Sequence, residues 1–202
     1  AYVSASYIKE SDGGGGDASA SASSSASGAG FKISAVFVRE NWTGGGKDKV
    51  LDCGQFELDS VDASGPPNTI TIKAEENQTA EVTISDVNID ASGTGRYDPR
   101  LGPVEGKAAI SAEGDGNVTI ELEGDNTAKS GYYRAGVEKD NGGNLTIADA
   151  DGDGALEAAG GEQAAGIGGG GGSSRDSSNI TIAGGEIEAF GGAQAAGIGG
   201  GA

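Results

Sequence analysis

Carboxylates and tyrosines are the residues of this chain whose types and spacing could do chemistry, because its 202 residues include no histidine. Imidazole acid–base catalysis and histidine-ligated zinc are therefore excluded. The segment "DADGDG" places Asp149, Asp151 and Asp153 at the spacing of a calcium loop. An EF-hand would also need a glutamate at the twelfth position, which is Gly160. The alternative is that these Asp and Gly residues only form a tight turn.

Two pairs of glutamates could supply the two carboxylates that a glycosidase needs, namely Glu121 with Glu123 and Glu186 with Glu188. Each pair occupies alternate, outward-facing positions of a predicted strand, where hydrated charge is the usual role of a glutamate. We therefore assign no catalytic residue and expect a protein that is not an enzyme. A polysaccharide-cleaving β-helix enzyme is the less favoured alternative.

The adjacent residues Tyr132 and Tyr133, followed by Arg134, are the best candidates for sugar binding. An aromatic ring supplies apolar area that a pyranose can cover, and its hydroxyl supplies a polar group. The alternative is that both rings only shield the edge of the fold at a corner. The sequence leaves both interpretations open.

Short repeated strands are the elements that must position these residues. An apolar-Thr-Ile triplet recurs at 82–84, 118–120, 145–147 and 180–182. A second triplet recurs at 108–110, 135–137, 165–167 and 196–198. A third apolar alternation lies between them at 87–91, 126–129, 155–158 and 186–190. Such short strands are stable only when stacked, so we predict an all-β fold, a parallel β-solenoid of about four three-stranded coils over 75–202.

Equivalent side chains of successive coils are predicted to form columns. The apolar residues of the first triplet would be buried in two columns, one of Val82, Val118, Leu145 and Ile180 and one of Ile84, Ile120, Ile147 and Ile182. The threonines would face solvent about 4.8 Å apart, as Thr83, Thr119, Thr146 and Thr181. This array could bind glycans, or threonine could simply suit an exposed strand. The preceding asparagines are interpreted as a structural ladder of Asn117, Asn144 and Asn179.

The string AGIGGG occurs at 165–170 and 196–201, and in the first case a Gly/Ser loop and NITI follow it. With the other repeats of 75–202, these strings resemble the glycine-rich repeats of secreted surface proteins of gut Firmicutes, often labelled carbohydrate-binding domain-containing. The resemblance implies an extracellular protein in contact with glycans and brings no catalytic motif. The insertion "RYDPRLGPVE" at 96–105 departs from the repeat and is expected to protrude as a loop. No coil follows the second AGIGGG, so we expect an open solenoid end. Either the chain is a fragment, or the end is covered by another copy or by tail subunits.

Residues 1–74 are predicted to be organised differently. We expect a short strand at 1–12, a flexible Gly/Ala/Ser-rich linker or loop at 13–30 and a small antiparallel β segment at 31–74. Within that segment, LDCG at 51–54, SGPP at 64–67 and ITIKA at 70–74 resemble the phage late control protein D family. This resemblance implies part of a tail-hub barrel.

The charge balance limits the partners of the chain. Its 13 Lys and Arg residues against 31 Asp and Glu residues give a net charge of −18, so we expect no nucleic-acid partner. No apolar run approaches the roughly 18 residues of a membrane-spanning helix, so we expect no membrane span.

The expected function is a non-catalytic extracellular structural and binding protein of a bacterial surface or a phage virion. Its expected partner is a glycan or bacterial surface polysaccharide, with no cofactor other than the calcium ion considered above. The alternative is a purely structural subunit of a phage tail hub or filament.

Overall fold

The computed structural model describes the backbone of residues 18–26, 31–39, 49–52, 69–172 and 177–202, and the side chains of the last two ranges. Every regular element in these ranges is a β-strand. None of them contains a helix that is long and apolar enough to cross a membrane. The strand predicted at 1–12 lies outside the described residues.

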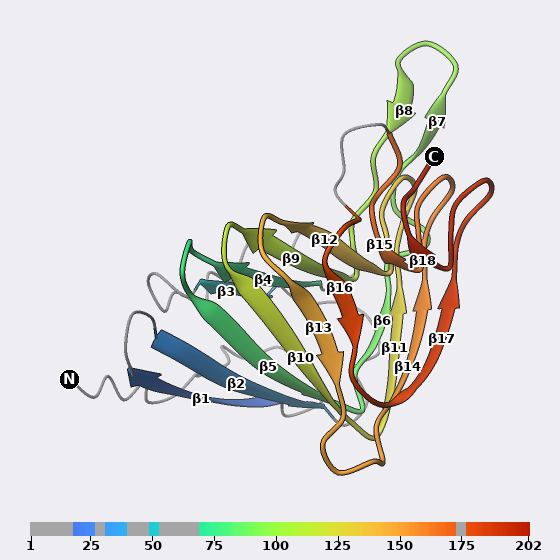
Figure 1. Cartoon of the computed structure of the whole chain (residues 1–202). Helices are drawn as coiled ribbons and strands as arrows, with labels where there is room; N and C mark the ends of the chain where they lie inside the picture. Colours follow the sequence, from blue (N-terminus) through green and yellow to red (C-terminus); the bar gives the residue numbers. More distant parts are fainter. Residues whose placement is uncertain (1–17, 27–30, 40–48, 53–68, 173–176) are drawn as a thin grey trace.

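Three sheets form the walls of the molecule (Figure 1). The first sheet contains, in spatial order, β1 (Ala18–Ala26), β2 (Phe31–Arg39), β5 (Thr79–Ser85), β10 (Asn117–Glu123), β13 (Leu145–Ala148) and β16 (Ile180–Ile182). The second contains β17 (Glu186–Phe190), β14 (Ala155–Ala159), β11 (Asp125–Lys129) and β6 (Asn88–Asp90). The third contains β18 (Ile198–Gly199), β15 (Ile167–Gly168), β12 (Val137–Asn141), β9 (Ile110–Gly114), β4 (Ile70–Ala74) and β3 (Lys49–Asp52).

Pairing within the three sheets is parallel except between β1 and β2. The chain visits the third, first and second sheets in turn, as β4–β5–β6, then β9–β10–β11, then β12–β13–β14 and then β15–β16–β17. Strands that are neighbours in a sheet are therefore separated in sequence by one circuit of the chain. The prediction of an all-β, parallel β-solenoid is confirmed.

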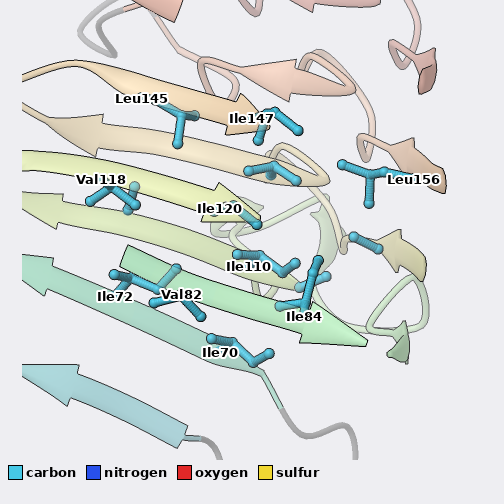
Figure 2. Packing of buried hydrophobic residues seen from close by; sticks show 14 of the residues in the cluster. Ile70, Ile72, Val82, Ile84, Ile110, Val118, Ile120, Leu145, Ile147 and Leu156 are labelled. Atoms are coloured by element: carbon cyan, nitrogen blue, oxygen red, sulfur yellow. The ribbon is translucent and has the colours of Figure 1, made fainter. Parts of the chain in front are cut away.

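The core lies between the three sheets and consists of aliphatic side chains in columns (Figure 2). One column contains Ile70, Ile110, Val137 and Ile167, all almost completely buried. In the first sheet, β5, β10 and β13 show the alternation of a half-buried strand. Each of these three strands buries only two or three side chains, so its stability depends on the coils beside it.

The register of the first sheet differs from the predicted columns at one step. Val118 pairs with Leu145 and then Ile180 as expected, but its partner on β5 is Ala80, whereas Val82 pairs with Ile120. The predicted alignment of Val82 with Val118 is therefore wrong by two residues. The corner before β5 has two more residues than the corner before β10. Strands β5 and β10 pair with their first residues aligned, so the apolar-Thr-Ile triplets of the two strands are not aligned. A shift of two leaves the buried face unchanged.

The N-terminal strands join the same sheets, which corrects two predicted boundaries. The prediction of a flexible linker over 13–30 is wrong for residues 18–26. These residues form β1 and pair with β2 over nine residues. Without β1, the backbone N–H and C=O groups on the outer edge of β2 would lack strand partners. The Ala and Ser side chains of 18–26 are small enough for this segment to pair along that edge. The rest of that range, 13–17 and 27–30, lies outside the described residues.

The predicted antiparallel segment at 31–74 is also not a separate unit. Strand β2 pairs in parallel with β5, and β3 pairs in parallel with β4. Strand β4 continues the third sheet by pairing with β9, so the predicted start of the solenoid at residue 75 falls between two strands of one circuit. Parallel pairing follows because each strand enters its sheet at the same corner as its neighbours.

Asn126 faces the core where other circuits carry Leu156 and Ile187. Its Oδ1 accepts the Val87 N–H at 3.0 Å, and its Nδ2 donates to the Ala155 carbonyl at 3.1 Å. Nδ2 also donates to the carbonyls of Glu123 and Gly124. This one amide thus satisfies backbone groups of three successive circuits at a corner, so the polar side chain is tolerated in the interior.

Glycines at one corner permit backbone contact between circuits. Gly131, Gly161 and Gly192 begin equivalent turns, and a Cβ on Gly161 would lie 1.9 Å from the Gly131 carbonyl oxygen. A Cβ on Gly192 would lie equally close to the Gly161 oxygen. Close stacking, rather than a positive φ, requires glycine at these positions.

We predict that Gly161→Ala lowers the free energy of unfolding by about 1–3 kcal/mol, because the circuits must move apart to accept the methyl group. Gly93→Ala is the matched control, since a Cβ there would meet no atom within 4 Å. Thermal unfolding followed by circular dichroism measures both variants. Equal unfolding temperatures for the two variants would contradict the close-stacking interpretation.

Candidate functional site

The tyrosine turn, residues 131–134, connects β11 of the second sheet to β12 of the third. The Arg134 N–H donates to the Gly131 carbonyl at 3.0 Å, which closes a β-turn with a positive φ of 63° at Tyr133. The following circuits repeat this turn with Gln163 and Gln194 at the positive-φ position. The scaffold is therefore shared, and the aromatic pair is specific to this circuit.

The two tyrosine rings stack on each other, with their centroids 4.5 Å apart and their planes 26° apart. The Tyr133 ring also packs against the backbone of Gly171, where an added Cβ would lie 2.7 Å from its Cδ1 atom. Desolvation raises the pKa of the Tyr132 hydroxyl, and Tyr133, Glu162 and Tyr97 contribute in the same direction. Both rings are partly exposed, so they form a fixed aromatic surface at the corner.

A projecting hairpin, formed by β7 (Arg96–Asp98) and β8 (Gly102–Val104), extends beyond the same corner (Figure 1). The insertion protrudes as expected, but it forms two antiparallel strands and not an irregular loop. The Asp98 carboxylate accepts the N–H groups of Arg100 and Leu101, and Gly102 has a φ of 81°. The sequence Asp-Pro-Arg-Leu-Gly therefore forms the turn.

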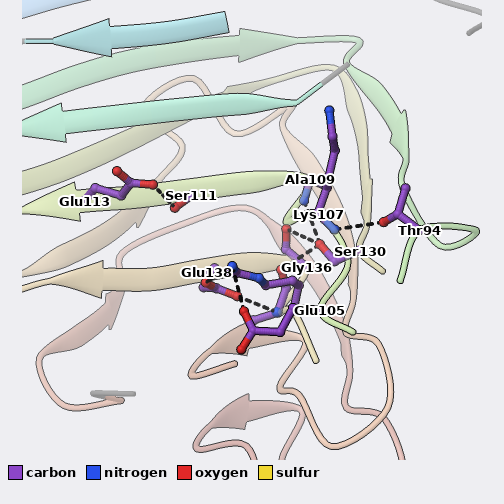
Figure 3. Close-up of polar contacts among 11 residues, drawn as sticks. Thr94, Glu105, Lys107, Ala109, Ser111, Glu113, Ser130, Gly136 and Glu138 are labelled. Atoms are coloured by element: carbon purple, nitrogen blue, oxygen red, sulfur yellow. Dashed lines mark hydrogen bonds and ion pairs between the residues drawn. The ribbon is translucent and has the colours of Figure 1, made fainter. Parts of the chain in front are cut away.

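The base of the projecting hairpin is bonded to the tyrosine turn. The Tyr132 N–H donates to the Thr94 carbonyl at 2.9 Å, and the Gly106 N–H donates to the Tyr132 carbonyl at 2.7 Å. Thr94 also accepts the Lys107 N–H on its hydroxyl at 2.8 Å (Figure 3). Tyr97 of the hairpin is 61% exposed and lies close enough to Tyr132 to affect its pKa. Tyr97 is not among the predicted site residues, and its only signal in the sequence is its place in the insertion at 96–105.

Arg134 links three parts of this region. Its guanidinium contacts Glu138 of β12 at 2.6 Å and Glu105, beside the hairpin, at 2.9 Å (Figure 3). The side chain of Glu138 is fully buried, and its second oxygen accepts the Ala135 N–H. Burial lowers the pKa of Arg134, but the carboxylates of Glu138 and Glu105 outweigh it, so the pKa is raised. Arg134 lies within an ion-pair cluster that joins hairpin, turn and sheet, and its contact with a sugar stays a prediction.

The predicted threonine array lies on a different wall. Thr119, Thr146 and Thr181 are paired in register on the first sheet, whereas the tyrosine turn connects the other two sheets. Thr83 is not in this column, because Glu81 pairs with Thr119. The structure therefore does not bring the threonines together with the tyrosines.

The predicted asparagine ladder begins with a side chain-to-backbone bond. Asn117 accepts the Asn144 N–H on its Oδ1 at 2.9 Å. The next contact is made by the backbone, since the Leu145 N–H donates to the Asn179 carbonyl at 3.0 Å. Asn179 has a φ of 57°, a conformation that asparagine tolerates better than most residues.

The acidic segment at 149–154 forms a turn organised by its first residue. The Asp149 carboxylate accepts the Gly152 N–H at 2.8 Å and the Gly154 N–H at 3.3 Å. Asp151 and Asp153 are exposed. Among the residues whose side chains are described, no group of three or more acidic, His or Cys residues is arranged to hold a metal ion. These contacts fit the tight-turn alternative, and calcium binding stays a prediction.

Comparison of the chain with protein-family models, with curated proteins and with solved structures found no match. The two family resemblances of the sequence therefore stay expectations, and the candidate site rests on its geometry.

We predict that Arg134→Met destabilises the fold by about 3–5 kcal/mol, because it leaves the buried Glu138 carboxylate without its cation. Arg96→Met on the exposed hairpin is the control and should change stability by about 0.5 kcal/mol or less. Chemical denaturation measures both. A small effect of Arg134→Met would mean that water or another group solvates Glu138.

We predict that Asp149→Ala lowers the free energy of unfolding by about 1–2 kcal/mol, because two turn hydrogen bonds are lost. Asp151→Ala, which removes no hydrogen bond described here, should leave it unchanged. Thermal unfolding with and without millimolar calcium separates the two interpretations. A calcium-dependent rise in the unfolding temperature that Asp151→Ala abolishes would establish the calcium loop instead.

Proposed function

We propose that this chain is a non-catalytic glycan-binding protein, a parallel β-solenoid of about four three-stranded coils displayed at a bacterial surface or on a phage-like tail. The observation that carries the proposal is the joining of the stacked Tyr132–Tyr133 pair to a projecting hairpin that bears the exposed Tyr97. The extracellular setting is supported by the resemblance of 75–202 to secreted surface repeats.

Aromatic surface and rigidity are the two properties that favour this proposal. Tyrosine rings bring apolar area for a sugar ring together with hydroxyls for its polar edge, and they lose little conformational entropy on binding. Tyr133 is held by the Tyr132 ring, by Gly171 and by a backbone turn. The side chain therefore loses little further conformational entropy when a ligand binds.

The nearby carboxylates favour binding over hydrolysis. Glu105 and Glu138 are both ion-paired to Arg134, so these two carboxylates hold the hairpin and β12 to the turn instead of facing each other across a sugar-binding space. A glycosidase would also need a second carboxylate across the bound sugar. We therefore propose a site that binds a glycan and does not cleave it.

Binding of the purified chain to a panel of bacterial cell-wall and capsular glycans, with and without calcium, tests the proposal. We expect Tyr132→Ala to weaken binding to the recognised glycan at least tenfold, equivalent to about 1.4 kcal/mol. Tyr97→Ala and Tyr133→Asn should have similar effects. Asparagine is chosen at position 133 because it tolerates the positive φ.

Gln163→Asn is the matched control, because Gln163 occupies the equivalent positive-φ position of the next circuit without an aromatic partner. It should leave binding unchanged. If folded, β-rich protein binds no glycan of the panel, the alternative of a purely structural subunit of a tail hub or filament would replace the proposal. Release of reducing ends from any glycan would instead identify the β-helix enzyme.

A further inference from the structure

Six large apolar side chains are exposed in the part of the chain whose side chains are described. Tyr97, Leu101 and Val104 lie on the projecting hairpin, and Ile182, Phe190 and Ile198 lie on β16, β17 and β18. The latter three are edge strands of the three sheets. Exposed apolar groups that cluster on an otherwise acidic surface commonly mark interaction sites.

The hairpin has two different faces. Tyr97 is paired with Pro103, so both project on one side, whereas Arg96 and Val104 are paired and project on the other. Leu101, in the turn, is 80% exposed, and its neighbour Arg100 is also exposed. Asp98 lies on the same side as Arg96 and Val104, and its carboxylate accepts the N–H groups of Arg100 and Leu101 in the turn. Together with these two turn residues, Arg96 and Val104 form an apolar surface of net positive charge, here called the hairpin tip surface, whose strand residues lie opposite the face that carries Tyr97.

The edge strand β17 has the complementary character. Glu186, Glu188 and Phe190 alternate along it and are all exposed, while Ile187 and Ala189 between them face the core. Phe190 is 53% exposed. These three outward residues form an apolar and acidic surface, here called the β17 face.

We propose that the hairpin tip surface of one copy of this chain docks on the β17 face of a second copy. Each surface combines exposed apolar area with charge, and the two charges are opposite. Because every copy carries a net charge of −18, two copies repel each other except where a basic surface meets an acidic one. Arginine is also one of the residue types that most often contribute a large share of the binding energy at interfaces.

The contact would be heterologous, because the two surfaces are different patches on one molecule. Such contacts build open chains or rings rather than closed two-fold dimers. The hairpin tip surface leaves the Tyr97 face of the hairpin uncovered, so assembly and glycan binding are compatible. A chain of copies would also present the tyrosine turn repeatedly to a polysaccharide, which increases avidity.

Sedimentation velocity of the whole chain over a concentration series tests the proposal. We expect a concentration-dependent series of oligomers, weakened at least tenfold by Leu101→Asp, by Arg100→Glu and by Phe190→Asp. The double variant Arg100→Glu with Glu188→Arg should recover association, because the charges are exchanged across the contact. Tyr132→Ala is the control that should leave association unchanged, and circular dichroism confirms the fold of each variant.

Two outcomes would overturn the proposal. A wild-type chain that stays monomeric at the highest attainable concentration excludes the contact. Association that is abolished by Phe190→Asp but is indifferent to Leu101→Asp and Arg100→Glu would show direct pairing between edge strands instead. Because the readout is mass and not glycan binding, failure of this proposal is distinguishable from failure of the proposed glycan site.

Discussion

Parallel register between successive circuits is the constraint on which the rest of this structure depends. A strand such as β13 buries only Leu145 and Ile147, so it cannot persist without β10 and β16 beside it. The corners must also bring backbones into direct contact, as Gly131 and Gly161 do. The stability of each circuit therefore depends on the circuits beside it, and a substitution at one corner also destabilises the adjacent circuits.

The same constraint explains how a repetitive scaffold acquires a local site. Three circuits use one turn geometry, with Tyr133, Gln163 and Gln194 at the same positive-φ position. The backbone fixes where these side chains project, and the sequence of one circuit then places aromatic rings there. The projecting hairpin is inserted at the preceding circuit, so its base lies directly against the tyrosine turn. Function carried by loops on a rigid repeat is a common arrangement.

Polar groups in the interior show what the stack tolerates. Asn126 replaces an aliphatic residue and satisfies backbone groups of three circuits. Lys139 is fully buried and donates to the Asn141 carbonyl at 2.6 Å. Glu138, on the opposite face of the same strand, is neutralised by Arg134. Each group is costly to bury and is accepted because it has a partner, which ties β12 to the corner and the hairpin.

Local pattern in the sequence determined the class of the fold. Short repeated triplets required a stack, and alternation with a period of two decided which residues face the core in β5, β10 and β13 of the first sheet and in β11, β14 and β17 of the second. Strands β9 and β12 of the third sheet depart from this alternation, because they bury consecutive residues. The absence of histidine limited the chemistry, and the tyrosine pair was visible as a candidate surface. The inferences about the strands succeeded because they depend on neighbours in the chain, whereas glycan binding by the tyrosine pair stays a prediction.

Tertiary structure alone decided everything that depends on corners and distant partners. Corner length placed Ala80, not Val82, beside Val118, and put Glu81 where Thr83 was expected. Pairing with β2 converted a small-residue stretch into β1. The approach of Tyr97 to Tyr132, and the burial of Glu138 beside Arg134, arise from segments that meet only after the chain has completed a circuit. The alternation of residue types along a strand specifies which side chains face the core. The register of paired strands, and the distance between remote side chains, depend on which strands meet in space.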